Sequence, residues 1–168
     1  KAGEAAVRKN VMAGRSLWRI LEAAQASGYL LDLPQIYKPN EVGKIAREKL
    51  LVISTGCQGE PMAATTKMVN KTHPDLRLSP GDTVIFSSKI IPGNEKSIFR
   101  LLNQLVEQGV EVLTEKDHFV HVSGHPSQTE LKRMYELVRP KVAIPVHGEL
   151  MHIHEHAKLA LEWGVSQS

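Results

Sequence analysis

The chain has 168 residues, of which 42% are hydrophobic and 23% charged, and its formal charge is +3 with a pI near 9.0. This composition is typical of a globular protein with one domain or two small ones. It excludes a bilayer-spanning helix, because no apolar run approaches the roughly 20 residues that such a helix needs. The single cysteine, Cys57, excludes an internal disulfide and favours a reducing compartment, so we expect a cytoplasmic protein with no membrane partner.

The charge balance and the first residues carry two further expectations. The mild basic excess permits a polyanionic partner such as nucleic acid without demanding one. The sequence opens in helix-like residues without an initiator methionine, so we expect it to be a piece of a longer protein.

In the first half of the chain, helical and strand patterns alternate. Apolar residues from Val7 to Ala24 recur at helical spacing and predict a helix, which is followed by a connector over residues 32–49. The run "KLLVIST", residues 49–55, predicts a strand buried on both faces. The break "GCQGEP" then puts Pro61 at the start of a predicted helix through "MAATTKMVN".

The second half continues the alternation. Strands are predicted at 82–88, 110–114, the beginning of 118–127, and 141–146, with helices at 95–109, 128–138 and 149–164. The helix at 95–109 has one apolar stripe, formed by Ile98, Leu101, Leu102, Leu105 and Val106. Strands that alternate with helices at this pitch predict an α/β fold, with a mostly parallel sheet and flanking helices.

The loops at the carboxyl ends of these strands are the candidate functional segments. Ligands of open α/β sheets gather at that edge, where helix N-termini also favour anions. The chemically unusual stretches all fall there: "TGCQGEP", "SSKIIPGNE", "HVSGHPS" and "PVHGE". We therefore expect the functional site at this edge.

Residues 144–156, "IPVHGELMHIHEH", contain four histidines and two glutamates. His152 and His156 are four apart on a predicted helix, a spacing that can bind zinc, but neither HExxH nor HxHxDH is present. Both share a helical stripe with Leu159 and Trp163, so packing explains them. We predict that His152, His154 and His156 are not metal ligands.

His147 stands apart from that triplet. It follows a predicted strand at the carboxyl end, and Gly148 allows the backbone to approach a ligand closely. An imidazole held there can offer a neutral nitrogen to a metal. From the residues alone, the alternative that His147 only caps a turn is equally possible.

The loop "HVSGHPS", residues 121–127, suits a phosphate. It offers two imidazoles, two hydroxyls and backbone amides, and one imidazole can act as a general acid. A polar turn with a serine N-cap is the alternative.

The loops "TGCQGEP" and "IPGNEKS" can also bind phosphate through their backbone amides, but neither has the GK[ST] of a P-loop. Cys57 is more typical of a turn than of a nucleophile.

Taken in order, these loops resemble the ribonuclease J group of β-CASP nucleases with a metallo-β-lactamase fold. The similar stretches include "ISTGCQGEPMAA", "GDTVIFSSKIIPGNEKSI", "HVSGHPSQTELKRMYELVRPK" and "IPVHGELMHIHEHAKLA", and they cover nearly the whole chain. Two departures are visible, Cys57 where serine is expected and Pro126 where alanine is expected.

The resemblance implies a discontinuous architecture. In such enzymes the β-CASP domain is inserted into the metallo-β-lactamase domain, and RNA runs between them to two zinc ions. Residues 1–115 would be a portion of the β-CASP domain, and residues 116–168 the returning C-terminal segment of the metallo-β-lactamase αββα domain.

The resemblance also implies roles for individual residues. His147 would bind zinc, and His125 would be catalytic near the scissile phosphate. RNA phosphate would be held by His121, Ser123, Gly124, His125 and Ser127. Loops of an RNA channel would include Gly56, Gln58, Gly59, Glu60, Gly93 and Asn94. The family's other zinc ligands belong upstream and are absent from this sequence, so we expect this chain by itself to bind no zinc and to be catalytically incomplete.

The function that the resemblance implies is part of a zinc-dependent ribonuclease in RNA processing and decay, with 5′-3′ exonuclease and endonuclease activity. RNA would be its partner, and the full-length protein would be a homo-oligomer. The alternative is a noncatalytic α/β module that binds RNA or a nucleotide at its strand ends.

Overall fold

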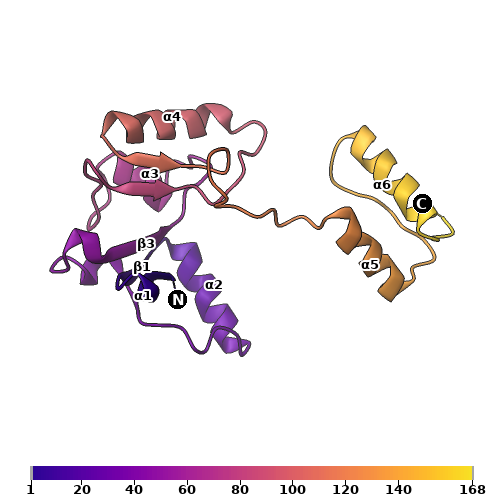
Figure 1. The fold of residues 1–168 in the computed structure, drawn as a ribbon, viewed down its shortest axis with the longest axis horizontal. Helices are drawn as coiled ribbons and strands as arrows, with labels where there is room; N and C mark the ends of the chain where they lie inside the picture. The colour runs from indigo at the N-terminus through magenta and orange to yellow at the C-terminus, as the bar shows by residue number, and fades with distance from the viewer. Residues whose placement is uncertain (1, 168) are drawn as a thin grey trace. The chain divides into compact units, whose positions relative to one another are not determined.

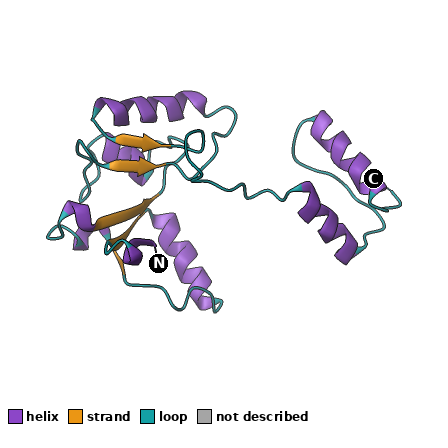
Figure 2. Ribbon diagram, viewed as in Figure 1, coloured by secondary structure: helices purple, strands orange, loops and turns teal. Residues whose placement is uncertain are grey.

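The structure is a computed structural model that describes residues 2–167. It divides into two compact units, one up to Val122 and the other from Ser123 (Figure 1). Short parallel strands are flanked by helices, so the predicted α/β class is confirmed (Figure 2). None of the helices described is both long and apolar enough to cross a membrane.

A three-stranded parallel sheet organises the first part of the first unit. Its strands are β1 (Lys9–Ala13), β2 (Ile36–Tyr37) and β3 (Leu50–Ser54), in the order β2-β1-β3. The other elements are α1 (Ala2–Ala5), α2 (Arg15–Ala26), α3 (Ala64–Val69) and the 3-10 turns η1 (Pro39–Glu41) and η2 (Arg47–Lys49). The core forms where Val11 and Ala13 of β1 pack with Ala64 and Met68 of α3.

The helix predicted from Val7 to Ala24 is wrong in its first half. Residues 10–13 are buried in the central strand β1, and the helix α2 begins only after Gly14. Pairing of β1 with β2 and β3, which lie far along the sequence, outweighs the local helical spacing. The strand predicted at residues 49–55 is confirmed as β3, although Val52 and Ile53 are 36% and 45% exposed rather than buried, because β3 is an edge strand of the described sheet.

A second, two-stranded parallel sheet completes the first unit. It pairs β4 (Thr83–Ile85) with β5 (Glu111–Leu113), and α4 (Glu95–Glu107) lies along it (Figure 1). The core between them contains Val69, Phe86, Leu101, Leu105 and Val110. Ile98, Leu101 and Leu105 of the predicted α4 stripe are buried, and Leu102 is partly buried, but Val106 is exposed.

The second unit consists of two helices and the segments that join them. The helices are α5 (Gln128–Val138) and α6 (Leu150–Glu162), and both were predicted. The strands predicted at the beginning of 118–127 and at 141–146 are not formed within the described residues, where Val142 makes only an isolated bridge to Gln167. A strand needs neighbouring strands to bond with, and Ile144 and Val146 are 78% and 75% exposed here.

His73 is a buried histidine of the first unit that the sequence patterns did not single out. Its Nδ1 accepts hydrogen bonds from the backbone N–H groups of Asp75 and Leu76, each at 3.2 Å. Burial lowers the pKa of His73 below its ordinary value of 6.5, and the nearby Asp75 carboxylate opposes that shift only in part.

This lowered pKa predicts a pH-dependent stability. The unfolded chain takes up the proton of His73 at a higher pH than the folded chain does. The contribution of neutral His73 to the stability of the folded chain is therefore fully present above pH 6.5, and it is lost as the pH falls below that value. We expect the urea concentration at the unfolding midpoint of the first unit to decrease when the pH is lowered from about 7.5 to about 5.5.

His73→Asn provides the control for this prediction. The asparagine side-chain oxygen can accept the same backbone amides but does not titrate. The variant should flatten the pH dependence, and a variant that keeps the wild-type slope would assign the effect to another group.

Candidate functional site

A cavity of about 410 Å³ lies in the second unit at the start of α5. Its lining comprises Ser123, Gly124, His125, Pro126, Glu130, Leu131 and Met134. The His125 backbone N–H donates a hydrogen bond to Ser123 Oγ at 3.2 Å, which shapes the loop locally. The loop predicted to hold phosphate therefore lines part of this space, which is open to solvent.

Ser127 caps α5. Its Oγ accepts a hydrogen bond from the Glu130 N–H at 3.4 Å, and Glu130 Oε2 accepts one from the Ser127 N–H at 2.8 Å. This reciprocal pair is a capping box, so the serine N-cap considered for this loop is present. The predicted role of Ser127 in phosphate binding stays a prediction.

Glu130 sets the polarity of the cavity wall. The hydrogen bonds from Ser127 hold the pKa of the Glu130 carboxyl below its ordinary value, which keeps this side chain negatively charged. A fixed carboxylate repels an anion. A phosphate would therefore bind at the opposite end of the loop, at Ser123, Gly124 and His125.

His147 lies beside His125. Their ring centroids are 6.4 Å apart with an interplanar angle of 40°, and both side chains are exposed. The structure thus brings together the two histidines expected to be catalytic and metal-binding.

The backbone at His147 is unusual. His147 has a φ of 69° and Gly148 a φ of 123°, so two successive residues lie in the left-handed region. For a non-glycine residue this conformation is uncommon, and it fixes the direction in which the imidazole leaves the chain.

Two histidines of the α6 triplet have local partners. His152 Nδ1 accepts a hydrogen bond from the Glu149 N–H at 3.2 Å at the start of α6, and His154 is exposed. His156 Nε2 lies 3.0 Å from the Tyr135 hydroxyl, with an edge-on ring contact at 6.1 Å. The packing interpretation holds for His156 but is wrong for His152, which caps the helix instead. The exclusion of all three as metal ligands stays a prediction.

The described side chains do not by themselves fit a zinc ion. Zinc sites in proteins use three or four protein ligands. Between residues 2 and 167, no group of three or more His, Cys, Asp or Glu side chains is placed to hold a metal. His147, with His125 beside it, is at most part of a ligand set.

The loops expected to line an RNA channel meet in the first unit. Gln58 bonds to residues 89–94, and Gly59 packs on the first turn of α4. Glu60 and Glu95 each accept a backbone N–H of their own loop, from Gln58 and Gly93. The structure therefore joins the stretch that contains Gly56, Gln58, Gly59 and Glu60 to the stretch that contains Gly93 and Asn94.

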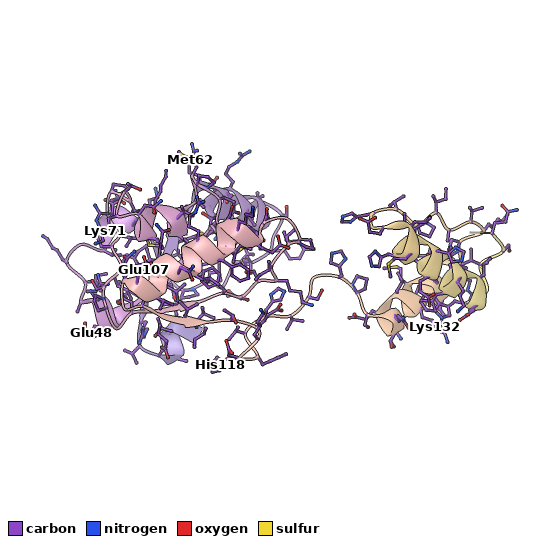
Figure 3. The ribbon with its side chains drawn as sticks, turned by 90° about the horizontal axis from the view of Figure 1, so that it is seen from above. Glu48, Met62, Lys71, Glu107, His118 and Lys132 are labelled. Atoms are coloured by element: carbon purple, nitrogen blue, oxygen red, sulfur yellow. The ribbon has the colours of Figure 1, made fainter. Side chains whose placement is uncertain are left out.

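Some cavity residues were missed by the sequence reasoning, and one predicted residue lies elsewhere. Glu130, Leu131 and Met134 line the cavity from α5, and the capping pattern that starts at Ser127 was the signal that places them one and two turns into a helix. Lys132, labelled in Figure 3, is exposed on the same helix and does not line the cavity. His121 belongs to the first unit, where it is half-buried.

Comparison with known families defines the class of protein. Residues 1–105 match the family described as "Ribonuclease J, beta-CASP domain". Residues 109–166 match the "Zn-dependent metallo-hydrolase RNA specificity domain". These matches place the chain among proteins that combine a β-CASP domain with a metallo-hydrolase RNA specificity domain. The chain belongs to the ribonuclease J family, and the resemblance seen in its sequence is confirmed.

Relatives from several bacteria agree with this assignment. The chain is 43% identical over 165 residues to "Ribonuclease J" of Sinorhizobium meliloti, covering 98% of the chain and 29% of the relative. It is 40% identical over 168 residues to that of Corynebacterium glutamicum, covering 99% and 23%. It is 39% identical over 162 residues to "Ribonuclease J2" of Bacillus subtilis, covering 96% and 29%. The chain thus spans less than a third of the length of these relatives.

Proposed function

We propose that this chain is part of a zinc-dependent ribonuclease that acts in RNA processing and decay as a 5′-3′ exonuclease and endonuclease. The observation that carries the proposal is the pairing of His125 and His147, 6.4 Å apart between ring centroids, beside a cavity at the start of a helix. The family matches to a ribonuclease J domain and to a zinc-dependent hydrolase domain support it.

The residues of the second unit have separate roles in phosphate binding, proton transfer and metal binding. The Ser123 hydroxyl and the Gly124 backbone N–H bind phosphate oxygens at the end of the loop that lies away from Glu130. His125, in the cavity wall, donates a proton to the leaving oxygen of the RNA. His147 would contribute one ligand to a zinc site, and the other ligands would come from elsewhere in the longer protein.

The proposal is tested with the longer protein that carries this chain. Purified with zinc or manganese, it should cleave single-stranded RNA, and removal of the metal with a chelator should stop cleavage. A folded, metal-loaded protein that leaves RNA intact would refute the proposal.

The domain organisation is part of the same proposal. Residues 1–115 form a β-CASP portion, and residues 116–168 return into a metallo-β-lactamase αββα domain. The exposed apolar side chains of Val142, Ile144 and Val146 support this assignment, because a strand at this position would bury them against neighbouring strands. We also propose that the longer protein is cytoplasmic. We propose that it is a homo-oligomer as well, and this proposal rests only on its likeness to the family.

A noncatalytic RNA- or nucleotide-binding module is the second candidate. The cavity at residues 123–126 favours it, since that cavity is formed by this chain alone. If the isolated chain binds RNA through phosphate contacts, its affinity should fall steeply as salt rises. An affinity that does not depend on salt would count against this candidate.

A further inference from the structure

Gln58 connects two loops that are far apart in the sequence. Its Nε2 donates a hydrogen bond to the Lys89 carbonyl oxygen at 2.8 Å. Its Oε1 accepts one from the Ile91 N–H at 3.1 Å and one from the Asn94 side-chain amide at 3.3 Å. The carboxamide therefore bonds at both of its ends to residues 89–94.

The backbone next to Gln58 adds a second point of attachment. A Cβ built on Gly59 would lie 2.7 Å from both the carbonyl carbon and the carbonyl oxygen of Ser97, in the first turn of α4. Gly59 also has a φ of 73°, which a larger residue adopts with strain. Only glycine lets the two segments approach this closely, so side chain and backbone together hold the loop after β3 against the loop before α4.

The position of this contact links it to a ligand-binding edge. One loop follows β3 of the three-stranded sheet and the other follows β4 of the two-stranded sheet, and in each sheet the carboxyl ends of the parallel strands are where ligands tend to bind. The second loop bears the exposed side chain of Lys89, and Lys96 is exposed in the first turn of α4. Cationic side chains attract phosphates, and the Glu60 and Glu95 carboxylates of the same two loops accept hydrogen bonds from the Gln58 and Gly93 N–H groups.

We propose that Gln58 is a positioning residue, which fixes residues 89–96 so that Lys89 and Lys96 meet the RNA backbone. The inference rests on the proposed ribonuclease function and changes the role expected for Gln58. Because the carboxamide is occupied by protein partners at both ends, Gln58 acts on RNA through the second loop and does not bind RNA itself.

The test compares two glutamines in the longer protein. Gln58→Met keeps the length of the side chain and removes its hydrogen bonds. Gln108→Met is the matched control, since Gln108 Nε2 also donates to a backbone carbonyl oxygen, that of Val69 at 2.9 Å, in the same unit but outside both loops. For each variant, KM and kcat are measured with a single-stranded RNA, together with the melting temperature.

We expect Gln58→Met to raise KM about fivefold or more with kcat within about twofold, the signature of lost uniform binding. Gln108→Met should leave KM unchanged while lowering the melting temperature to a similar degree. If both variants have the same KM, Gln58 is only structural and the inference is wrong. If the wild-type protein cleaves RNA in that experiment, the proposed function stands even when the inference about Gln58 is wrong. If the wild-type protein does not cleave RNA, both the proposed function and the inference about Gln58 are wrong.

Discussion

His147→Ala in the longer protein is expected to abolish RNA cleavage, with a loss of at least about 10²-fold, and to lower the bound metal. His147 is exposed in a left-handed turn beside His125, so its imidazole packs in no core and its removal should cost little stability. Metal content, cleavage rate and melting temperature measured on one preparation separate these effects.

His154→Ala is the matched control. His154 is also an exposed histidine of the second unit, on α6 and outside the cavity lining. It should change neither metal content nor cleavage. If His154→Ala lowers the metal content and His147→Ala does not, the assignment of the zinc ligand is wrong.

His125→Ala is expected to slow cleavage by about 10²- to 10⁴-fold, the range of a lost general acid. RNA affinity should fall only modestly, because the amides and hydroxyl of the loop remain. Single-turnover cleavage and equilibrium RNA binding are measured in parallel, so that chemistry and binding are distinguished.

The control for His125 is another exposed histidine. His118, labelled in Figure 3, is exposed in the first unit, and His118→Ala should leave both measurements at wild-type values. A His125→Ala protein that cleaves at the wild-type rate, or whose loss is entirely one of affinity, would remove His125 from the chemistry.

Helices were predictable where their signals are local. Helix α5 matches the predicted residues 128–138, because Ser127 and Glu130 form a capping box within one turn. Strands were less predictable, since a strand depends on neighbours elsewhere in the sequence. Residues 9–13 read as helical until β2 and β3 pair with them, and residues 141–146 read as a strand but find no sheet among the described residues.

The candidate site follows the same division. His125 and His147 were expected at one edge because each follows a predicted strand, and they do lie together, although neither strand forms here. The contacts of Gln58 with Lys89 and Asn94 were not predictable, because a side-chain hydrogen bond across more than thirty residues leaves no periodic pattern. The glycines around Gln58 predicted a loop there, but they did not indicate which segment of the chain this loop contacts.

A crystal structure of the longer protein, with the metal present and a short phosphorothioate RNA bound, tests the site most directly. The account predicts a phosphate of the RNA at Ser123, Gly124 and His125, with His147 bound to the metal beside it. An RNA phosphate or a metal on α6 at His152 or His154, with the loop at residues 123–127 empty, would contradict it.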